Sequence, residues 1–210
     1  MTPKNLSIPN SVLCVAAVKY ATLEEILPLI KEGFTTLGWS TVQQFRKLSK
    51  ILPHNCRHHF IGYLQKNKVN QLVLSDIDLI HSVDRMDLIE TLAGAAQSKS
   101  KIQYILLQVK TDVTKEHGFT YEEIDAIFPS LLARQSLSVK GLMTIPPLVD
   151  NPEENRAIYK RMREFRDYLE QKYHISLPYL SMGMSNDYKI AIEEGATMIR
   201  LGRILLGKEV

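Results

Sequence analysis

The chain has 210 residues, 45% of them hydrophobic, and a formal net charge of only +3 at pH 7. This length is sufficient for one sizeable core, and the scattered lysines and arginines do not form the basic stripe that binds nucleic acid. Two cysteines far apart in the sequence indicate a reducing compartment, and the polar N-terminus and short apolar runs exclude a signal segment and a membrane span. We therefore expect a cytoplasmic protein with neither a nucleic-acid nor a membrane partner.

Short apolar runs alternate with amphipathic stretches along the whole chain. The apolar runs predict strands at residues 13–18, 34–37, 58–61, 79–81, 104–109, 139–143, 177–181 and 197–201. The amphipathic stretches predict helices at residues 22–32, 42–51, 65–74, 84–97, 121–132, 153–173 and 188–194.

This alternation predicts a parallel sheet, because parallel neighbours need long crossover connections. Eight strand–helix units match a closed (β/α)₈ barrel of the TIM type better than an open doubly wound sheet. The main alternative is a Rossmann-like sheet, but no G-x-G-x-x-G motif follows the first predicted strand. We expect an α/β protein with a small single domain over residues 1–210.

Two glycine-containing motifs follow the last predicted strands, where the carboxyl ends of barrel strands converge and active sites form. The seventh strand leads through LSMGMSND (180–187) into a helix expected to begin near Ser185, and the eighth ends in IRLGR (199–203). A helix N-terminus and the hydroxyl of Ser181 or Ser185 suit a phosphate group. Gly202 would let a second backbone segment approach it. The two motifs together favour a phosphate site.

Lys19 follows the first predicted strand, which lies beside the eighth when a barrel closes. A lysine at a strand end is by itself typical of an ordinary surface position. Beside the cationic Arg200 and partly desolvated, however, its amine could lose a proton and form a Schiff base. A phosphorylated aldehyde that bridges the two positions is pyridoxal 5′-phosphate (PLP). Arg200 would then stay protonated and leave the pyridine nitrogen unprotonated.

Several segments resemble the pyridoxal phosphate homeostasis protein family, whose fold is similar to the N-terminal barrel of alanine racemase. The matching segments are VAAVK around Lys19, HFIGYLQKNKV at 59–69, IHSVD at 80–84, LLQV at 106–109, GLMTIPP at 141–147 and LSMGMSNDYKIAIEEGATMIRLGRILLG at 180–207. The resemblance covers nearly the whole chain from about residue 12.

The resemblance also implies a set of cofactor contacts. They are Lys19 as the aldimine lysine, Ser181, Ser185, Gly202 and Arg203 at the phosphate, Arg200 near the ring nitrogen, and Met143, His81 and Ser82 near the ring. No metal is expected, because His58 and His59 are adjacent and would point to opposite faces of a strand.

The sequence departs from the family pattern at some of these positions. Trp39 and Ser40 replace the glutamate and asparagine of the usual G-E-N-x-V-Q-E, and Val18 replaces a serine before the lysine. Trp39 could stack on the cofactor or simply fill volume. The helix that usually opens the family is shortened or missing before Asn10.

The first functional hypothesis is a PLP carrier in intracellular PLP homeostasis that has no dedicated catalytic reaction. PLP-dependent apoenzymes are its expected partners, and we expect a monomer. An alternative is a PLP-dependent amino-acid racemase or lyase of low activity, which needs a second acid or base. Tyr20 and Tyr63 are candidates for that role, although tyrosines near strand ends are more often packing residues. A third hypothesis is a Schiff-base aldolase acting on a sugar phosphate without a cofactor.

Overall fold

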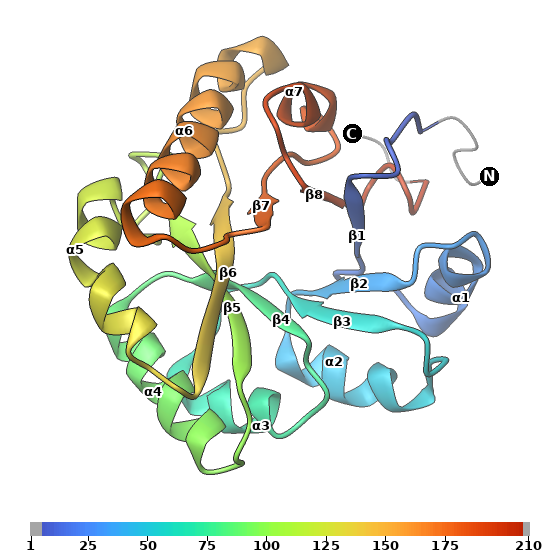
Figure 1. Cartoon of the computed structure of the whole chain (residues 1–210). Helices are drawn as coiled ribbons and strands as arrows, with labels where there is room; N and C mark the ends of the chain where they lie inside the picture. The colour runs from blue at the N-terminus through green and yellow to red at the C-terminus, as the bar shows by residue number, and fades with distance from the viewer. Residues whose placement is uncertain (1–5, 208–210) are drawn as a thin grey trace.

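The computed structural model describes residues 6–207, and their strands form one closed barrel in which each strand is parallel to its neighbours (Figure 1). The strands follow one another around the barrel in chain order, as β1 (Leu13–Ala17), β2 (Thr36–Trp39), β3 (Arg57–Phe60), β4 (Leu79–Val83), β5 (Gln103–Val109), β6 (Leu137–Thr144), β7 (Tyr179–Ser181) and β8 (Met198–Leu201).

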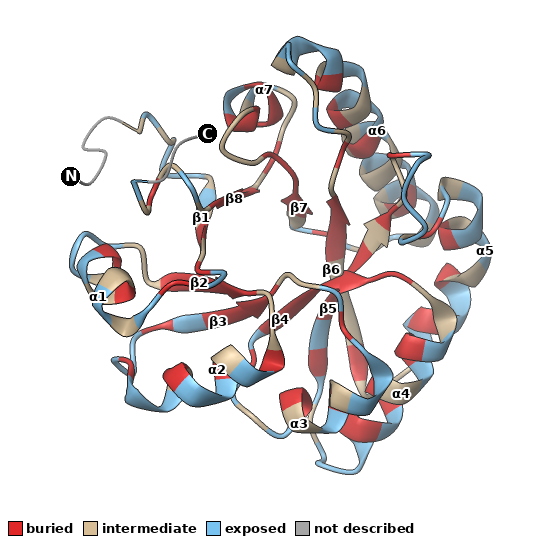
Figure 2. Cartoon of the chain, turned by 180° about the vertical axis from the view of Figure 1, so that it is seen from behind, coloured by how far each residue is buried: buried red, intermediate tan, exposed pale blue. Residues whose placement is uncertain are grey.

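Helices connect the strands and surround the barrel. They are α1 (Leu23–Lys31), α2 (Val42–Leu48), α3 (Val69–Val73), α4 (Met86–Gln97), α5 (Tyr121–Leu132), α6 (Arg156–Tyr173) and α7 (Tyr188–Glu193), with 3₁₀ turns at Ser49–Ile51, Lys66–Lys68 and Pro152–Asn155. Buried residues occupy the strands and the inner faces of the helices, while exposed residues cover the outside (Figure 2). Capping boxes at Thr22 and Thr120 begin α1 and α5, because each threonine accepts a backbone N–H that the helix leaves unpaired.

Strand β1 closes the barrel by pairing with β2 on one side and with β8 on the other. Ala16 lies opposite Leu37 of β2 and opposite Leu201 of β8. This closure confirms the predicted TIM-type barrel and excludes the open Rossmann-like sheet.

The hydrophobic core has two layers. Most buried apolar side chains lie in one large cluster between strands and helices. A second, smaller cluster contains Leu79, Leu106, Met143 and Met198. These four residues come from different strands around the ring, so they meet inside the barrel, as the packed interior of this fold requires.

Two predicted elements differ from the structure. Strand β2 begins two residues later than the predicted start at Phe34, because the chain first finishes helix α1. There the amide of Phe34 donates to Leu29 O and that of Thr35 donates to Gly33 O. The predicted helix at 65–74 divides into a 3₁₀ turn and the short α3.

The sequence predicts that the helix which usually opens the family is shortened or missing before Asn10. Residues 6–12 contain no helix, and the residues before them lie outside the described part of the chain. Among the helices of residues 6–207, none combines the length and apolar character that crossing a bilayer requires.

Candidate functional site

Lys19 lies at the carboxyl-terminal mouth of the barrel, in a tight turn between β1 and α1. Val18 is buried, and its amide donates to Gly38 O of β2 (3.0 Å), which anchors the turn. Tyr20 takes a left-handed conformation (φ 60°) before Thr22 caps α1. The Lys19 side chain is exposed, with Nζ 5.0 Å from the centroid of the Tyr20 ring, and it forms no ion pair within residues 6–207. A primary amine is therefore available at the predicted position.

The loop after β7 has a fixed shape. Gly183 has φ 93°, and a Cβ there would lie 2.6 Å from the Cβ of Ala191, so glycine is required. The Asp187 carboxylate accepts the Met184 amide (2.7 Å) and closes a turn before α7. Helix α7 begins after this turn at Tyr188, which confirms the start predicted by the amphipathic stretch at 188–194 and not the start near Ser185. Ser185 is half-buried in the turn, and its amide and hydroxyl have no partner in the described part of the chain.

Asp187 is itself held from the neighbouring helix α6 and from the 3₁₀ turn that precedes this helix. Its Oδ2 accepts the Tyr159 hydroxyl (2.6 Å) and the Asn155 side-chain amide (3.0 Å), and all three residues are buried. Burial, together with Asp187, raises the pKa of Tyr159, so the phenol remains a donor. Helix α6 therefore determines the shape of the loop that carries Ser185.

The loop after β8 runs between the β7 loop and Lys19. A Cβ on Gly202 would lie 3.1 Å from Ala17 O, so the absence of a side chain lets the end of β8 approach the end of β1. The Arg200 amide donates to Gly183 O (3.0 Å) and joins this loop to the one after β7. In residues 6–207 the amides of Gly202 and Arg203 have no partner. With Ser185 they form a set of free donors of the kind that holds a phosphate.

Arg200 places a positive charge inside the barrel mouth, and within residues 6–207 no carboxylate bonds to it, although the charge of Asp187 acts on it from nearby. Its guanidinium donates to Ser181 O (2.9 Å), Ser181 Oγ (2.7 Å) and Thr144 O (2.7 Å), all of which are neutral acceptors. Burial lowers the pKa of Arg200 to about 10, so the side chain is protonated at pH 7. A buried cation whose hydrogen-bond acceptors are all neutral favours an anionic or electron-rich ligand beside it.

A chain of buried hydrogen bonds continues from Arg200 across the barrel. Ser181 Oγ lies 3.0 Å from His81 Nδ1, and His81 Nε2 lies 3.0 Å from His59 Nδ1. Because a guanidinium can only donate, Ser181 Oγ accepts from it and gives its own proton to His81 Nδ1. His81 then carries its proton on Nε2 and donates to His59.

Both histidines of this chain are neutral at pH 7. Burial lowers the pKa of His59 to about 4. The pKa of His81 lies well below its usual value because of burial, with further contributions from His59 and Arg200. His59 thus belongs to the inner polar chain, whereas the adjacent His58 faces the other side of the strand and bonds to Trp39 (3.1 Å). Among the described residues no cluster of possible metal ligands is found.

The remaining predicted contacts take different positions. Met143 packs inside the barrel, one residue before the Thr144 carbonyl that Arg200 binds. Ser82 is buried, and its hydroxyl donates to the carbonyl of Gly62. Arg203 is exposed. The structure thus joins Ser181, His81 and Arg200 directly, whereas Ser82 is bonded to the loop after β3.

Trp39 does not face this mouth. It is fully buried between the barrel and α2, with its ring centroid 5.7 Å from that of Phe45. Of the two alternatives for Trp39, the structure supports filling of the core. Ser40 is half-buried, and its carbonyl lies where a Cβ on Gly62 would have to go.

Tyr20 and Tyr63 are more exposed than expected for packing residues. Their exposed fractions are 75% and 50%, so neither is a core residue. Tyr63 packs against the tilted His117 ring, with centroids 4.5 Å apart, at the edge of the mouth.

Sequence reasoning missed His59, Thr144 and the Asp187 cluster. Alternation along β3 places His59 inside the barrel, and Asp187 lies within the motif LSMGMSND. Both patterns weakly indicate that these residues belong to the site. Nothing in the helical pattern of α6 distinguishes Tyr159 from its other buried residues.

Comparison with known proteins agrees with the fold and identifies the family. The family model described as "Alanine racemase, N-terminal domain" matches residues 5–210. Pyridoxal phosphate homeostasis proteins from Aquifex aeolicus and Synechocystis are 38% and 36% identical to the chain. The matches cover 95% and 96% of this chain and 88% and 93% of those proteins.

Solved structures are similar over the same extent. PipY of Synechococcus elongatus PCC7942, solved with PLP bound, is 32% identical with a TM-score of 0.86, covering 96% of this chain and 95% of its own. Alanine racemase of Clostridium difficile 630 shares the fold at 16% identity with a TM-score of 0.76, covering 94% of this chain and 52% of the racemase. The chain thus belongs to the pyridoxal phosphate homeostasis protein family.

Proposed function

We propose that this chain binds PLP at the carboxyl-terminal mouth of the barrel and acts in PLP homeostasis. The observation that carries the proposal is the buried Arg200 guanidinium, whose hydrogen-bond acceptors are all neutral, beside two loops with free amides. PLP fits these residues, because a phosphate needs N–H and O–H donors and a pyridine nitrogen can accept a hydrogen bond from a guanidinium. The relative PipY has been solved with PLP bound.

Each residue has a role in this proposal. When bound, PLP would supply an aldehyde that reacts with amines. Lys19 would present its primary amine to that aldehyde. Ser185 and the amides of Gly202 and Arg203 would hold the phosphate, and Arg200 would face the ring nitrogen as a hydrogen-bond donor.

The other predicted contacts support these groups. Ser181 and His81 orient the Arg200 guanidinium, Met143 would lie near the ring, and Ser82 holds the neighbouring loop. The protein acts as a monomeric carrier in the cytoplasm that buffers the reactive aldehyde and passes it to PLP-dependent apoenzymes, with no dedicated reaction of its own.

Trapping the cofactor tests the assignment of Lys19. Protein incubated with PLP is expected to absorb in the visible, and borohydride reduction followed by peptide mass mapping is expected to place the pyridoxyl group on Lys19. Lys19→Ala should lose both signals. Lys110→Ala is the matched control, because Lys110 follows β5 at the same mouth. A label on Lys110, or an unchanged label in Lys19→Ala, would contradict the assignment.

Turnover distinguishes the carrier from the enzyme. PLP-loaded protein is incubated with D- and L-amino acids, and racemisation and loss of amino acid are measured. Spectral shifts without turnover are expected of a carrier. Steady turnover that disappears in Lys19→Ala would instead establish the racemase or lyase alternative.

A further inference from the structure

The turn that carries Lys19 contains a backbone conformation that its sequence disfavours. The Ala21 amide donates to Val18 O (3.0 Å), which closes a four-residue turn with Lys19 and Tyr20 at its centre. Within this turn only Tyr20 has a positive φ, of 60°. A positive φ at the third residue is typical of a type II turn, where glycine or asparagine is usual and a tyrosine is strained. Neighbouring structure therefore has to hold the turn in this shape.

Gln44 supplies that hold from helix α2. Its side-chain amide nitrogen donates to Val18 O (2.8 Å) and to Ala21 O (3.0 Å), the carbonyls at the two ends of the turn. Because Ala21 is buried, its carbonyl depends on a protein donor and not on water. A single NH₂ group thus uses both of its protons to clamp the turn.

The position of Gln44 in its helix would ordinarily give its side chain another partner. Thr41 caps α2, and its hydroxyl accepts the Gln44 amide (3.3 Å), so Gln44 is the third residue of the helix. A glutamate or glutamine at this position commonly reaches back to the amide of the capping residue. The Gln44 side chain instead donates to the neighbouring turn. An ionised glutamate could not do so, because it has no proton to give.

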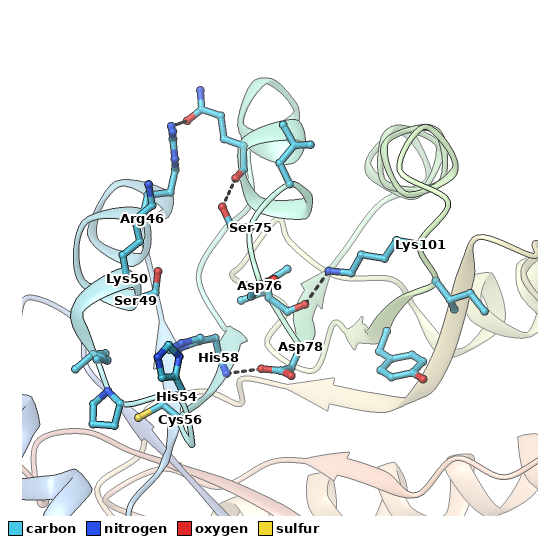
Figure 3. A pocket seen from close by; sticks show the side chains of 17 residues that line it. Arg46, Ser49, Lys50, His54, Cys56, His58, Ser75, Asp76, Asp78 and Lys101 are labelled. Carbon is cyan, nitrogen blue, oxygen red and sulfur yellow. Dashed lines mark hydrogen bonds between the residues drawn. The ribbon is translucent and has the colours of Figure 1, made fainter.

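Helix α2 runs from the carboxyl-terminal mouth to the opposite end of the barrel. Its first turn, with Gln44, lies beside the end of β1. Arg46 and the 3₁₀ extension, with Ser49 and Lys50, line a pocket of about 840 Å³ at the amino-terminal end, before strands β3, β4 and β5 (Figure 3). Neither Gln44 nor the turn that it clamps lines that pocket. The clamp therefore belongs to the mouth at which the PLP site is proposed.

We propose that Gln44 is a positioning residue of the PLP site, which holds the turn so that the Lys19 amine stays at the mouth for an incoming aldehyde. This inference rests on the function proposed above. No ion pair fixes Lys19 within residues 6–207, and the ring that its Nζ contacts, 5.0 Å away, is that of Tyr20 in the same turn. The backbone of the turn therefore determines where the amine lies. A nucleophile that is held in place spends more of its time in reactive geometry.

The rate at which Lys19 reacts tests this role. Full-length protein is mixed with PLP and quenched with borohydride at successive times, and the pyridoxyl group on Lys19 is quantified by peptide mass mapping. Gln44→Met keeps the volume of the side chain without its donors and should slow labelling about tenfold. Gln43→Met is the matched control, because Gln43 is exposed on the same helix and bonds to nothing in the described chain. Its labelling rate should equal that of the parent.

Binding without reaction separates positioning from damage to the fold. Pyridoxine 5′-phosphate has a hydroxymethyl group in place of the aldehyde, so calorimetric titration with it measures only the phosphate and ring contacts. Its Kd should be the same in Gln44→Met as in the parent. Without any ligand, hydrogen exchange of the Ala21 amide should be faster in Gln44→Met, because the turn loosens. A Kd raised as much as the labelling rate falls would mean that the substitution disrupts the whole mouth, and would overturn the positioning role.

The strain at Tyr20 provides a second test. Asparagine adopts a positive φ more readily than tyrosine, so the turn of Tyr20→Asn needs less support. Adding Gln44→Met to Tyr20→Asn should slow labelling less than about threefold. Equal slowing in both backgrounds would overturn the proposal, as would labelling and exchange rates that Gln44→Met leaves unchanged. A parent protein that PLP does not label at Lys19 would contradict the proposed function itself and, with it, this role.

Discussion

Two serines in the same loop region have different surroundings. Ser181 is fully buried and connects the Arg200 guanidinium to His81, acting as acceptor to the first and donor to the second. Ser185 is half-buried, and its hydroxyl bonds to nothing in the described chain. The first hydroxyl is therefore part of the folded network, and the second is available to a ligand.

Alanine substitutions should separate these roles. Ser181→Ala leaves His81 Nδ1 without a donor and removes one Arg200 acceptor, so the free energy of unfolding should fall by about 1–3 kcal/mol. Ser185→Ala should change it by less than about 0.5 kcal/mol but weaken PLP binding, because one phosphate donor is lost. Urea unfolding and PLP titration measure the two effects. Equal stability losses in both variants would contradict this division.

At the scale of elements, helix α6 supports the β7–α7 loop from outside the barrel. Tyr159 of α6 and Asn155 at the end of the preceding 3₁₀ turn both donate to Asp187, whose other oxygen accepts the Met184 amide within the loop. A single buried carboxylate thus connects the long helix to the turn that carries Ser185. The positions of the loop amides depend on α6, although none of its residues is expected to touch the cofactor.

Tyr159→Phe tests this support. Removing the hydroxyl takes one donor from the buried Asp187 carboxylate, which should cost about 1–3 kcal/mol of stability and weaken PLP binding as the loop loosens. Tyr168→Phe is the control on the same helix, because Tyr168 is 44% exposed and bonds to the surface residue Asp125. The free energy of unfolding of Tyr168→Phe should stay within about 0.5 kcal/mol of that of the parent protein. Unchanged PLP affinity in Tyr159→Phe would show that the loop keeps its shape without α6.

At the scale of the whole molecule, topology explains why the site could be placed from sequence. Once eight strand–helix units close into a ring, the ends of β7, β8 and β1 must be neighbours, which brings Ser185, Gly202 and Lys19 to one mouth. The predicted start of β2 was wrong because the apolar side chain of Phe34 is typical of a strand, whereas its amide donates to Leu29 O at the end of α1.

Contacts across the barrel could not be predicted in the same way. Ser181 and His81 are 100 residues apart, and periodicity shows only that each points inward, not that their polar atoms meet. The direction in which the Trp39 side chain points could not be predicted either, because a shift of one residue in strand register decides whether it faces the mouth or α2. Such facts follow from the shear and packing of the closed ring, which composition and spacing do not specify.

The neutral histidines inside the barrel predict how stability depends on pH. Because burial lowers the pKa of His59 to about 4 and that of His81 in the same direction, the unfolded chain takes up their protons first as pH falls. The contribution of His59 is fully present above the unfolded pKa of about 6.5 and is lost as pH falls toward about 4. His59 should add a slope of about 1.4 kcal/mol per pH unit in that window, and His81 and His58 add in the same direction.

Urea unfolding between pH 7.5 and pH 4.5 measures this slope. His59→Gln removes one buried titrating group, so its stability should fall less steeply with decreasing pH, by about 1.4 kcal/mol per unit below pH 6. His54→Gln is the control, because His54 is exposed and lies outside the barrel interior. The stability of His54→Gln should depend on pH with the same slope as that of the parent protein. If His59→Gln and the parent lost stability in parallel, His59 would be protonated as readily in the folded barrel as in the unfolded chain, and the direction assigned to the hydrogen bonds from Arg200 to His59 would be wrong.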